Sequence, residues 1–203
     1  MKETFFNISE DKKRRVIDAA LTEFASSGYE KTSLDAVISR VGISKGGLYE
    51  YIESKKDLFT FILNYAYEEL FTYIQNKKPA DADFPKDPLE RTRSISSIAV
   101  DFYIQSPEII SFIVASSQVG EAGIRNHVLD VFDSYFLKLY ESSDFSSAKF
   151  HKDQVLNLLK WLLIKTRNVF QESVVSGGEK NECKEKYLNE WKFYLKVLKD
   201  GMY

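Results

Sequence analysis

Long stretches of this chain lack both proline and glycine, and this feature most constrains what it can fold into. Only four prolines and nine glycines occur among the 203 residues. Between these breakers the apolar residues recur at helical rather than strand spacing. In residues 11–27, for example, one helical face carries Val16, Ile17, Ala20, Leu21 and Phe24. We therefore expect an all-α protein of about nine helices, with no convincing strand.

Caps and breakers set the expected bounds of these helices. Serine or threonine precedes several apolar runs and glycine follows others, as is typical of helix starts and ends. Residues 77–87, with two prolines and three aspartates, indicate a loop and a possible boundary in the chain. The expected helices cover residues 11–27, 32–41, 44–51, 54–76, 88–105, 107–119, 124–140, 152–175 and 181–200.

Composition narrows the class of protein. The chain is 44% hydrophobic and 29% charged, which is ordinary for a globular protein and excludes a disordered or collagen-like chain. Its single cysteine, Cys183, excludes an internal disulfide. No apolar run reaches the ~18 residues that a membrane span needs, and the chain starts without a signal-peptide pattern. We therefore expect a soluble cytoplasmic protein without a membrane partner.

The first 53 residues combine three short predicted helices, and the turn Val41-Gly42-Ile43-Ser44 joins the last two. This arrangement is typical of a helix-turn-helix, whose second helix enters the major groove of DNA. Gly46 and Gly47 in that helix each cost about 1 kcal/mol relative to alanine, and close approach of the backbone to a ligand would explain them. A three-helix unit with a purely structural role is the alternative interpretation. The residues expected to point outward are Lys45, Tyr49 and Tyr51.

Residues 11–60 resemble the DNA-binding domain of the TetR family of bacterial transcriptional repressors. The order and spacing of the matching segments are intact over about a quarter of the chain, whereas the remainder matches only in length and helical character. The segments that carry the resemblance are Ile17-Asp18-Ala19-Ala20-Leu21 with Phe24, Gly28-Tyr29-Glu30-Lys31-Thr32-Ser33, Ile38, Val41-Gly42-Ile43-Ser44-Lys45-Gly46-Gly47-Leu48-Tyr49, and Ser54-Lys55-Lys56-Asp57-Leu58.

Position and resemblance together predict a role for each matching residue. Hydroxyls and backbone amides at helix starts can hold phosphate, Lys45 can reach a guanine edge or a phosphate, and the paired glycines let the helix lie close to the bases. Glu50 departs from the family, which usually has a neutral, aromatic or basic residue there. The same helix lacks arginine, asparagine and glutamine, the usual bidentate base readers, so much of the sequence specificity is expected to come from DNA shape. The predicted DNA-binding residues are Thr32, Ser33, Ser44, Lys45, Gly46, Gly47, Tyr49, Tyr51 and Lys55.

Residues 54–203 are expected to form a helical domain that binds an effector and dimerises. The predicted helix over residues 152–175 is apolar almost all round, which indicates burial on more than one side. The final helix carries large apolar residues at similar spacing, namely Tyr187, Leu188, Trp191, Tyr194, Leu195 and Leu198. The last two helices of two chains would then form a four-helix interface, although a purely intramolecular core is the alternative. The resemblance also implies a homodimer that reads a palindromic operator of double-stranded DNA.

Aromatic residues suggest where a small molecule could bind. Ligand pockets are mostly apolar, and the resemblance implies an effector pocket, so an apolar or aromatic effector is expected. Most aromatics at helical spacing are plain core, and Trp161 could instead lie at the dimer interface. The predicted pocket residues are Phe61, Tyr65, Phe102, Tyr103, Phe112, Phe132, Phe136 and Trp161.

The expected function is a repressor that a small effector releases from its operator. An effector-independent helical module that binds DNA or a protein is the alternative. An enzyme is not expected, because the chain lacks the Glu-x-x-His motif of bundle metal sites and has no phosphate-binding glycine loop. His127 and His151 are isolated, and Cys183 lies in a charged segment without an obvious partner. We expect no cofactor and no metal.

Overall fold

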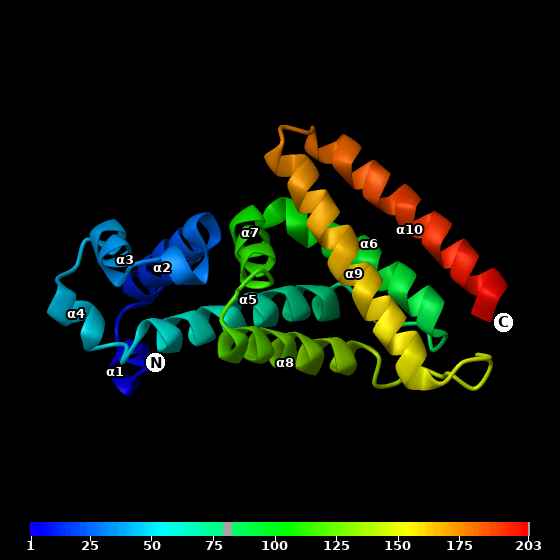
Figure 1. The fold of residues 1–203 in the computed structure, drawn as a ribbon, viewed down its shortest axis with the longest axis horizontal. Coiled ribbons are helices and arrows are strands. Elements are labelled where there is room, and N and C mark those ends of the chain that lie inside the picture. The colour runs from blue at the N-terminus through cyan, green and yellow to red at the C-terminus, as the bar shows by residue number, and fades with distance from the viewer. Residues whose placement is uncertain (79–82, 203) are drawn as a thin grey trace. The chain divides into compact units, whose positions relative to one another are not determined.

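The structure is a computed structural model that describes residues 1–78 and 83–202. These residues form ten helices and no strand, so the all-α prediction is confirmed (Figure 1). Part of the predicted loop over residues 77–87, namely residues 79–82, lies outside the described residues. The helices are α1 (Glu3–Phe6), α2 (Glu10–Lys31), α3 (Leu34–Val41), α4 (Lys45–Tyr49), α5 (Lys55–Asn76), α6 (Pro88–Gln105), α7 (Pro107–Ser116), α8 (Ala122–Leu139), α9 (Lys152–Val175) and α10 (Lys180–Met202).

Local signals explain most of these bounds. Asp87 caps α6 by accepting from two backbone amides, and Pro88 occupies the first turn, where its missing N–H costs nothing. Gly28 breaks the helical conformation near the end of α2 with a φ of 72°, a left-handed value that glycine adopts without strain. The four-residue helix α1 was not predicted, because it is too short to show a helical period.

The helices group into two compact units. The first comprises residues 1–69 and 108–133, and the second comprises residues 70–107 and 134–203. In the core of the first unit, the rings of Phe24, Phe59 and Phe112 pack against one another, with centroids 5.2 to 6.2 Å apart. The functional division predicted between residues 53 and 54 stays a prediction.

In the second unit, α10 packs against both α6 and α9, and α6 also contacts α9. Its aromatic core includes Tyr103, Phe170 and Tyr187, whose ring centroids lie 5.8 to 6.1 Å apart. Burial raises the pKa of the Tyr187 phenol well above its ordinary value. The Tyr187 phenol is therefore uncharged in this aromatic core.

Among the described residues, no single helix combines the length and the apolar composition needed to cross a bilayer.

Candidate DNA-binding site

Two serine caps, one glycine and one arginine hold the turn between α3 and α4 in place. Ser33 caps α3 by accepting from the amide of Ala36 at 3.2 Å, and Ser44 caps α4 by accepting from the amide of Gly47 at 3.0 Å. Gly42 ends α3 with a φ of 76°, in the left-handed region where helices commonly stop at glycine. Arg15 of α2 donates to the carbonyl of Val41 at 2.6 Å and so ties this turn to α2. The result is a rigid helix-turn-helix.

The N-terminal end of α4 is open to solvent. Leu48 is buried and anchors the helix, while Ser44, Lys45, Gly46 and Tyr49 are exposed. A Cβ added at Gly46 would meet no atom within 4 Å, so this glycine leaves the backbone bare rather than avoiding a clash. This open end is the surface that could approach base edges.

Gly47 has a different role. A Cβ at this position would lie 3.2 Å from the hydroxyl oxygen of Ser44, the same atom that caps α4. A side chain there would press on the cap. We infer that Gly47 protects the start of the helix, whereas Gly46 exposes it.

Three of the predicted DNA-binding residues have side chains that point into the protein. Thr32 is 3% exposed, and its hydroxyl donates to the carbonyls of Glu23 and Gly28. The Lys55 ammonium donates to the carbonyls of Glu30 and Thr32 at 3.2 Å each and lies 4.7 Å from the centre of the Tyr29 ring. The expectation that these side chains face phosphate is corrected, because both hold the connection between α2 and α3.

Tyr51 is the third such residue. It is 4% exposed and packs edge-on against Phe5 of α1, with the ring centroids 6.0 Å apart. It does not point outward as expected, because α1 covers it. Ser33 remains exposed and serves as the cap of α3.

The helix α1 also fastens the far end of α4. The amide of Lys2 donates to the carbonyl of Tyr51 at 2.7 Å, and the Lys2 ammonium donates to that of Tyr49 at 2.8 Å. The Thr4 hydroxyl donates to the carbonyl of Glu50. These bonds satisfy carbonyls that a helix end leaves without partners. The sequence signal for this contact is the Phe5–Phe6 pair, which precedes the first long helix.

Known proteins share this arrangement. Residues 16–60 match the model of the bacterial regulatory proteins of the tetR family. Over 148 residues the chain is 30% identical to YuxN of Bacillus subtilis, an uncharacterized HTH-type transcriptional regulator, and the match covers 73% of this chain but only 46% of YuxN. A TetR-family regulator from Chloroflexus aurantiacus matches with a TM-score of 0.72 and 21% identity, over 99% of this chain and 97% of that one. Residues 16–60 therefore form a DNA-binding domain of the TetR family.

A further TetR relative carries a more specific name. IcaR of Staphylococcus aureus, a negative transcriptional regulator of the biofilm operon icaADBC, is 27% identical over 186 residues. The match covers 75% of this chain and 100% of IcaR.

Lys45 is the one basic side chain of α4, the predicted reading helix, and it already forms an ion pair. The Lys45 ammonium lies 3.2 Å from a carboxylate oxygen of Asp35 on α3, and both side chains are exposed. An exposed ion pair of this kind is weak, so DNA phosphate can compete with Asp35 for the lysine. Asp35 therefore holds the lysine beside the exposed start of α4 and would oppose its transfer to DNA.

The variant Asp35→Asn should bind operator DNA roughly threefold to tenfold more tightly, because Lys45 no longer has to leave a carboxylate. The log–log slope of affinity against salt should steepen by about one, as expected for one more phosphate contact. Fluorescence anisotropy across a salt series measures both quantities. Asp130→Asn, which removes an exposed acid on α8, is the control and should change neither. Unchanged affinity in Asp35→Asn would contradict the competition.

A second carboxylate links the end of α2 to the start of α8. The Glu30 side chain accepts from the amides of Gly120 at 2.7 Å and Glu121 at 3.3 Å, just before α8 begins. A carboxylate at a helix N-terminus interacts favourably with the free N–H groups there. The backbone amides of Glu30 itself and of Gly120 hold the pKa of this carboxyl below its usual 4.5.

The lowered pKa of Glu30 makes its contribution to stability depend on pH. A carboxyl with a lowered folded pKa adds stability above pH 4.5, and that stability is lost as the pH falls through the lowered value. Glu30→Gln should therefore lower Tm at pH 7, and the difference from wild type should shrink as the pH falls below 4.5. Thermal unfolding from pH 7 to 3 measures this, and the exposed Glu3→Gln serves as control. A Tm difference that is constant with pH would contradict the linkage.

The eight predicted pocket residues divide between the two units. Phe61, Tyr65, Phe112 and Phe132 lie in the first, and the other four lie in the second. Several belong to separate aromatic contacts: Phe61 packs on Phe5, Phe132 on Tyr67, Phe102 on Tyr73 and Phe136 on Tyr140.

Trp161 is the most exposed of the eight predicted pocket residues. It is 61% exposed on α9, and its place in the predicted pocket stays a prediction. The alternative position at an interface fits its exposure. For the other seven residues the effector pocket stays a prediction.

Proposed function

We propose that this protein is a cytoplasmic transcriptional repressor that binds palindromic operator DNA as a homodimer and is released by a small apolar or aromatic effector. The observation that carries the proposal is the open N-terminal end of α4, where Ser44, Lys45 and Gly46 are exposed on a helix fixed at both ends. Rigid presentation of a helix start is what major-groove reading requires. The relative IcaR, named as a negative regulator, supports repression rather than activation.

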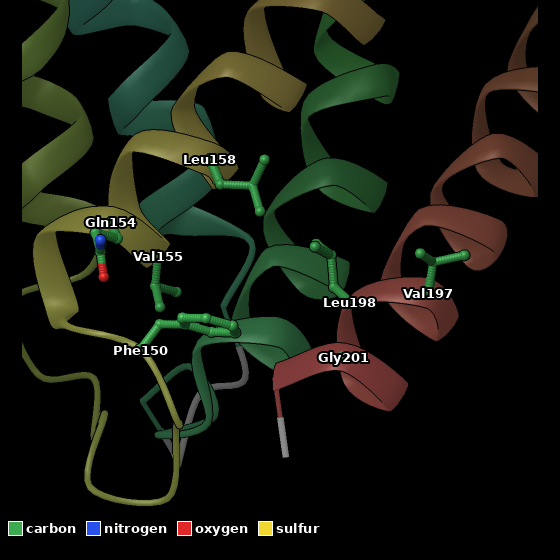
Figure 2. Close-up of a pocket in the computed structure, with 7 residues that line it drawn as sticks. All are labelled: Phe150, Gln154, Val155, Leu158, Val197, Leu198 and Gly201. Atoms are coloured by element: carbon green, nitrogen blue, oxygen red, sulfur yellow. The ribbon is translucent and has the colours of Figure 1, made fainter.

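Exposed apolar side chains support dimerisation through α9 and α10. Leu158 and Trp161 stand on α9, and Phe193 and Val197 stand on α10, all substantially exposed. Large apolar side chains gathered on neighbouring helices usually mark an interface. A hollow of about 340 Å³ adjoins these side chains. As Figure 2 shows, α9 contributes Val155 and Leu158 to its lining, and α10 contributes Val197 and Leu198. A second copy would cover this surface and form a four-helix interface through the last two helices. Tyr187, Trp191 and Leu195, which the sequence suggested for this interface, are instead buried within the single chain.

Homodimerisation sets the form of the DNA site. Two copies related by a two-fold axis present two α4 helices, so the operator should be a palindrome with half-sites about one helical turn apart. The reading helix carries one lysine and no arginine, asparagine or glutamine, which are the usual bidentate base readers. DNA shape should therefore contribute much of the sequence preference.

The proposed release is a shift between two states of the dimer. The effector binds the state in which the two reading helices no longer match the operator spacing. Ligand and DNA then weaken each other's binding by the same factor. Equal affinity of an effector for free and DNA-bound protein would rule out this mechanism.

Selection of bound duplexes from a random DNA pool tests the function. At about 0.15 M salt, the wild-type protein should enrich a palindrome, while the double variant Lys45→Ala with Gly46→Phe should enrich none. The double variant places a bulky ring where the backbone is now bare, in a position with free space around it, so folding should be retained. Circular dichroism of the variant provides that check. Failure of the wild-type dimer to enrich any sequence would contradict the proposed function.

A further inference from the structure

A second hollow lies between α6 and α10, within the second unit. Its volume is about 440 Å³, within the ~300–1,000 Å³ typical of ligand pockets. Leu188, Trp191 and Leu195 of α10 supply its apolar lining. None of the eight predicted effector residues lines it. It is therefore a different site from the predicted effector pocket.

The polar part of this hollow is cationic. Arg93 and Ser97 of α6 and Lys192 of α10 line it together with Ser96, whose hydroxyl is already donated to the carbonyl of Arg93. The Lys192 ammonium donates only to the side-chain oxygen of Asn189, at 3.3 Å, and among the described residues no carboxylate lies within ion-pair distance of it.

The Arg93 guanidinium has one acidic neighbour. It lies 3.4 Å from the carboxylate of Glu90, and both side chains are largely exposed, so this pair is weak. Elsewhere between the same two helices, Lys184 is paired with Asp101 and adds no net charge. The hollow thus holds an excess of positive charge beside an apolar surface.

Two residues of the proposed dimer surface, Phe193 and Val197, lie on a different face of α10 from the residues that line this hollow. Leu188, Lys192 and Leu195 follow the i, i+4, i+7 spacing of one helical face. Phe193 and Val197 lie roughly half a turn away around the helix, at 100° per residue. A partner seated on Phe193 and Val197 therefore leaves the residues of the hollow available.

We propose that this hollow binds an amphipathic monoanion, a molecule with an apolar chain or ring and one carboxylate. The apolar part lies on Leu188, Trp191 and Leu195, where its contact with water is lost. The carboxylate accepts charge-assisted hydrogen bonds from Arg93 and Lys192, and the Ser97 hydroxyl is a third donor. The proposal concerns binding alone and does not depend on DNA recognition.

Tryptophan fluorescence provides the test on the full chain. The protein has two tryptophans, so Trp161→Phe leaves Trp191 in the hollow as the sole reporter. Titration with sodium decanoate below its micelle concentration should change the Trp191 emission saturably. Decanol, which has the same chain without charge, should bind at least tenfold more weakly, and sodium acetate should give no change. The absence of any saturable response to decanoate would overturn the proposal.

Charge variants separate recognition of the carboxylate from apolar adsorption. In the Trp161→Phe background, Arg93→Gln with Lys192→Gln should weaken decanoate binding at least tenfold and leave decanol binding unchanged. Glu90→Gln should tighten decanoate binding, because Arg93 loses its competing acid. The matched control removes two exposed, unpaired cations elsewhere, Arg125→Gln with Lys149→Gln, and should have no effect. Equal binding of decanoate and decanol that survives the Arg93 and Lys192 changes would also overturn the proposal.

The DNA selection experiment is run in parallel on the wild-type protein, because Trp161 lies in the proposed dimer surface. Enrichment of a palindrome without decanoate binding would reject only the anion site. Decanoate binding without enrichment would reject only the proposed operator recognition.

Discussion

Replacing Arg91 with alanine should lower the free energy of unfolding by about 3–5 kcal/mol, because the protein loses a buried guanidinium and all the hydrogen bonds that it donates. Arg91 is 2% exposed on α6. Its guanidinium donates to the carbonyls of Phe84, Pro85 and Leu139 at 2.8–3.0 Å. It also donates to the hydroxyl of Ser142 at 2.8 Å. Alanine leaves these acceptors without a donor, and each unsatisfied buried group costs about 1–3 kcal/mol.

Urea unfolding followed by circular dichroism measures this loss. The matched control is Arg93→Ala, which removes the same side chain two residues along α6 from a largely exposed position. That change should stay within about 0.5 kcal/mol of wild type. A loss below about 1 kcal/mol in Arg91→Ala would show that the carbonyls find water or other donors.

The double variant Trp161→Glu with Phe193→Glu should convert the proposed dimer to a monomer and weaken operator binding at least a hundredfold. Both side chains are more than half exposed in the single chain, so their replacement should not disturb the core. In a dimer they would lose contact with water, and carboxylates there would be desolvated beside one another at a cost of several kcal/mol. The DNA effect follows because a monomer engages one half-site instead of two.

Sedimentation equilibrium and fluorescence anisotropy measure the two effects separately. Leu129→Glu with Leu137→Glu is the control, since it makes the same chemical change at two exposed leucines of α8. The control should remain dimeric. If the Trp161 and Phe193 variant also remains dimeric, the interface is not where we propose it to be.

Local sequence signals predicted well where the helices of the candidate DNA-binding site begin and end. Ser44 and Gly42 act within one helical turn of themselves, so their roles as cap and helix end could be read from the sequence. The directions of Tyr51 and Lys55 could not, because segments distant in the sequence determine them. Tyr51 is covered by α1, and Lys55 is drawn to the carbonyls of Glu30 and Thr32.

The aromatic residues also show that the sequence pattern alone does not predict the surroundings of a side chain. Helical spacing identifies Phe112 and Trp161 equally as apolar positions, yet Phe112 is fully buried against Phe59 and Trp161 is mostly exposed. Periodicity gives the face of a helix but does not say what covers that face. The neighbours along the fold decide whether such a face becomes core, pocket or interface.

The two-ended attachment of α4 bears on how its specificity could be re-engineered. A helix of five residues has no stability of its own in water, so its shape is supplied from outside. One support, Ser44, is adjacent in sequence, but the other comes from Lys2 and Thr4, more than forty residues away. The structural module that reads DNA is therefore discontinuous. A graft of residues 44–51 into another scaffold should lose its shape unless residues 1–5 travel with it.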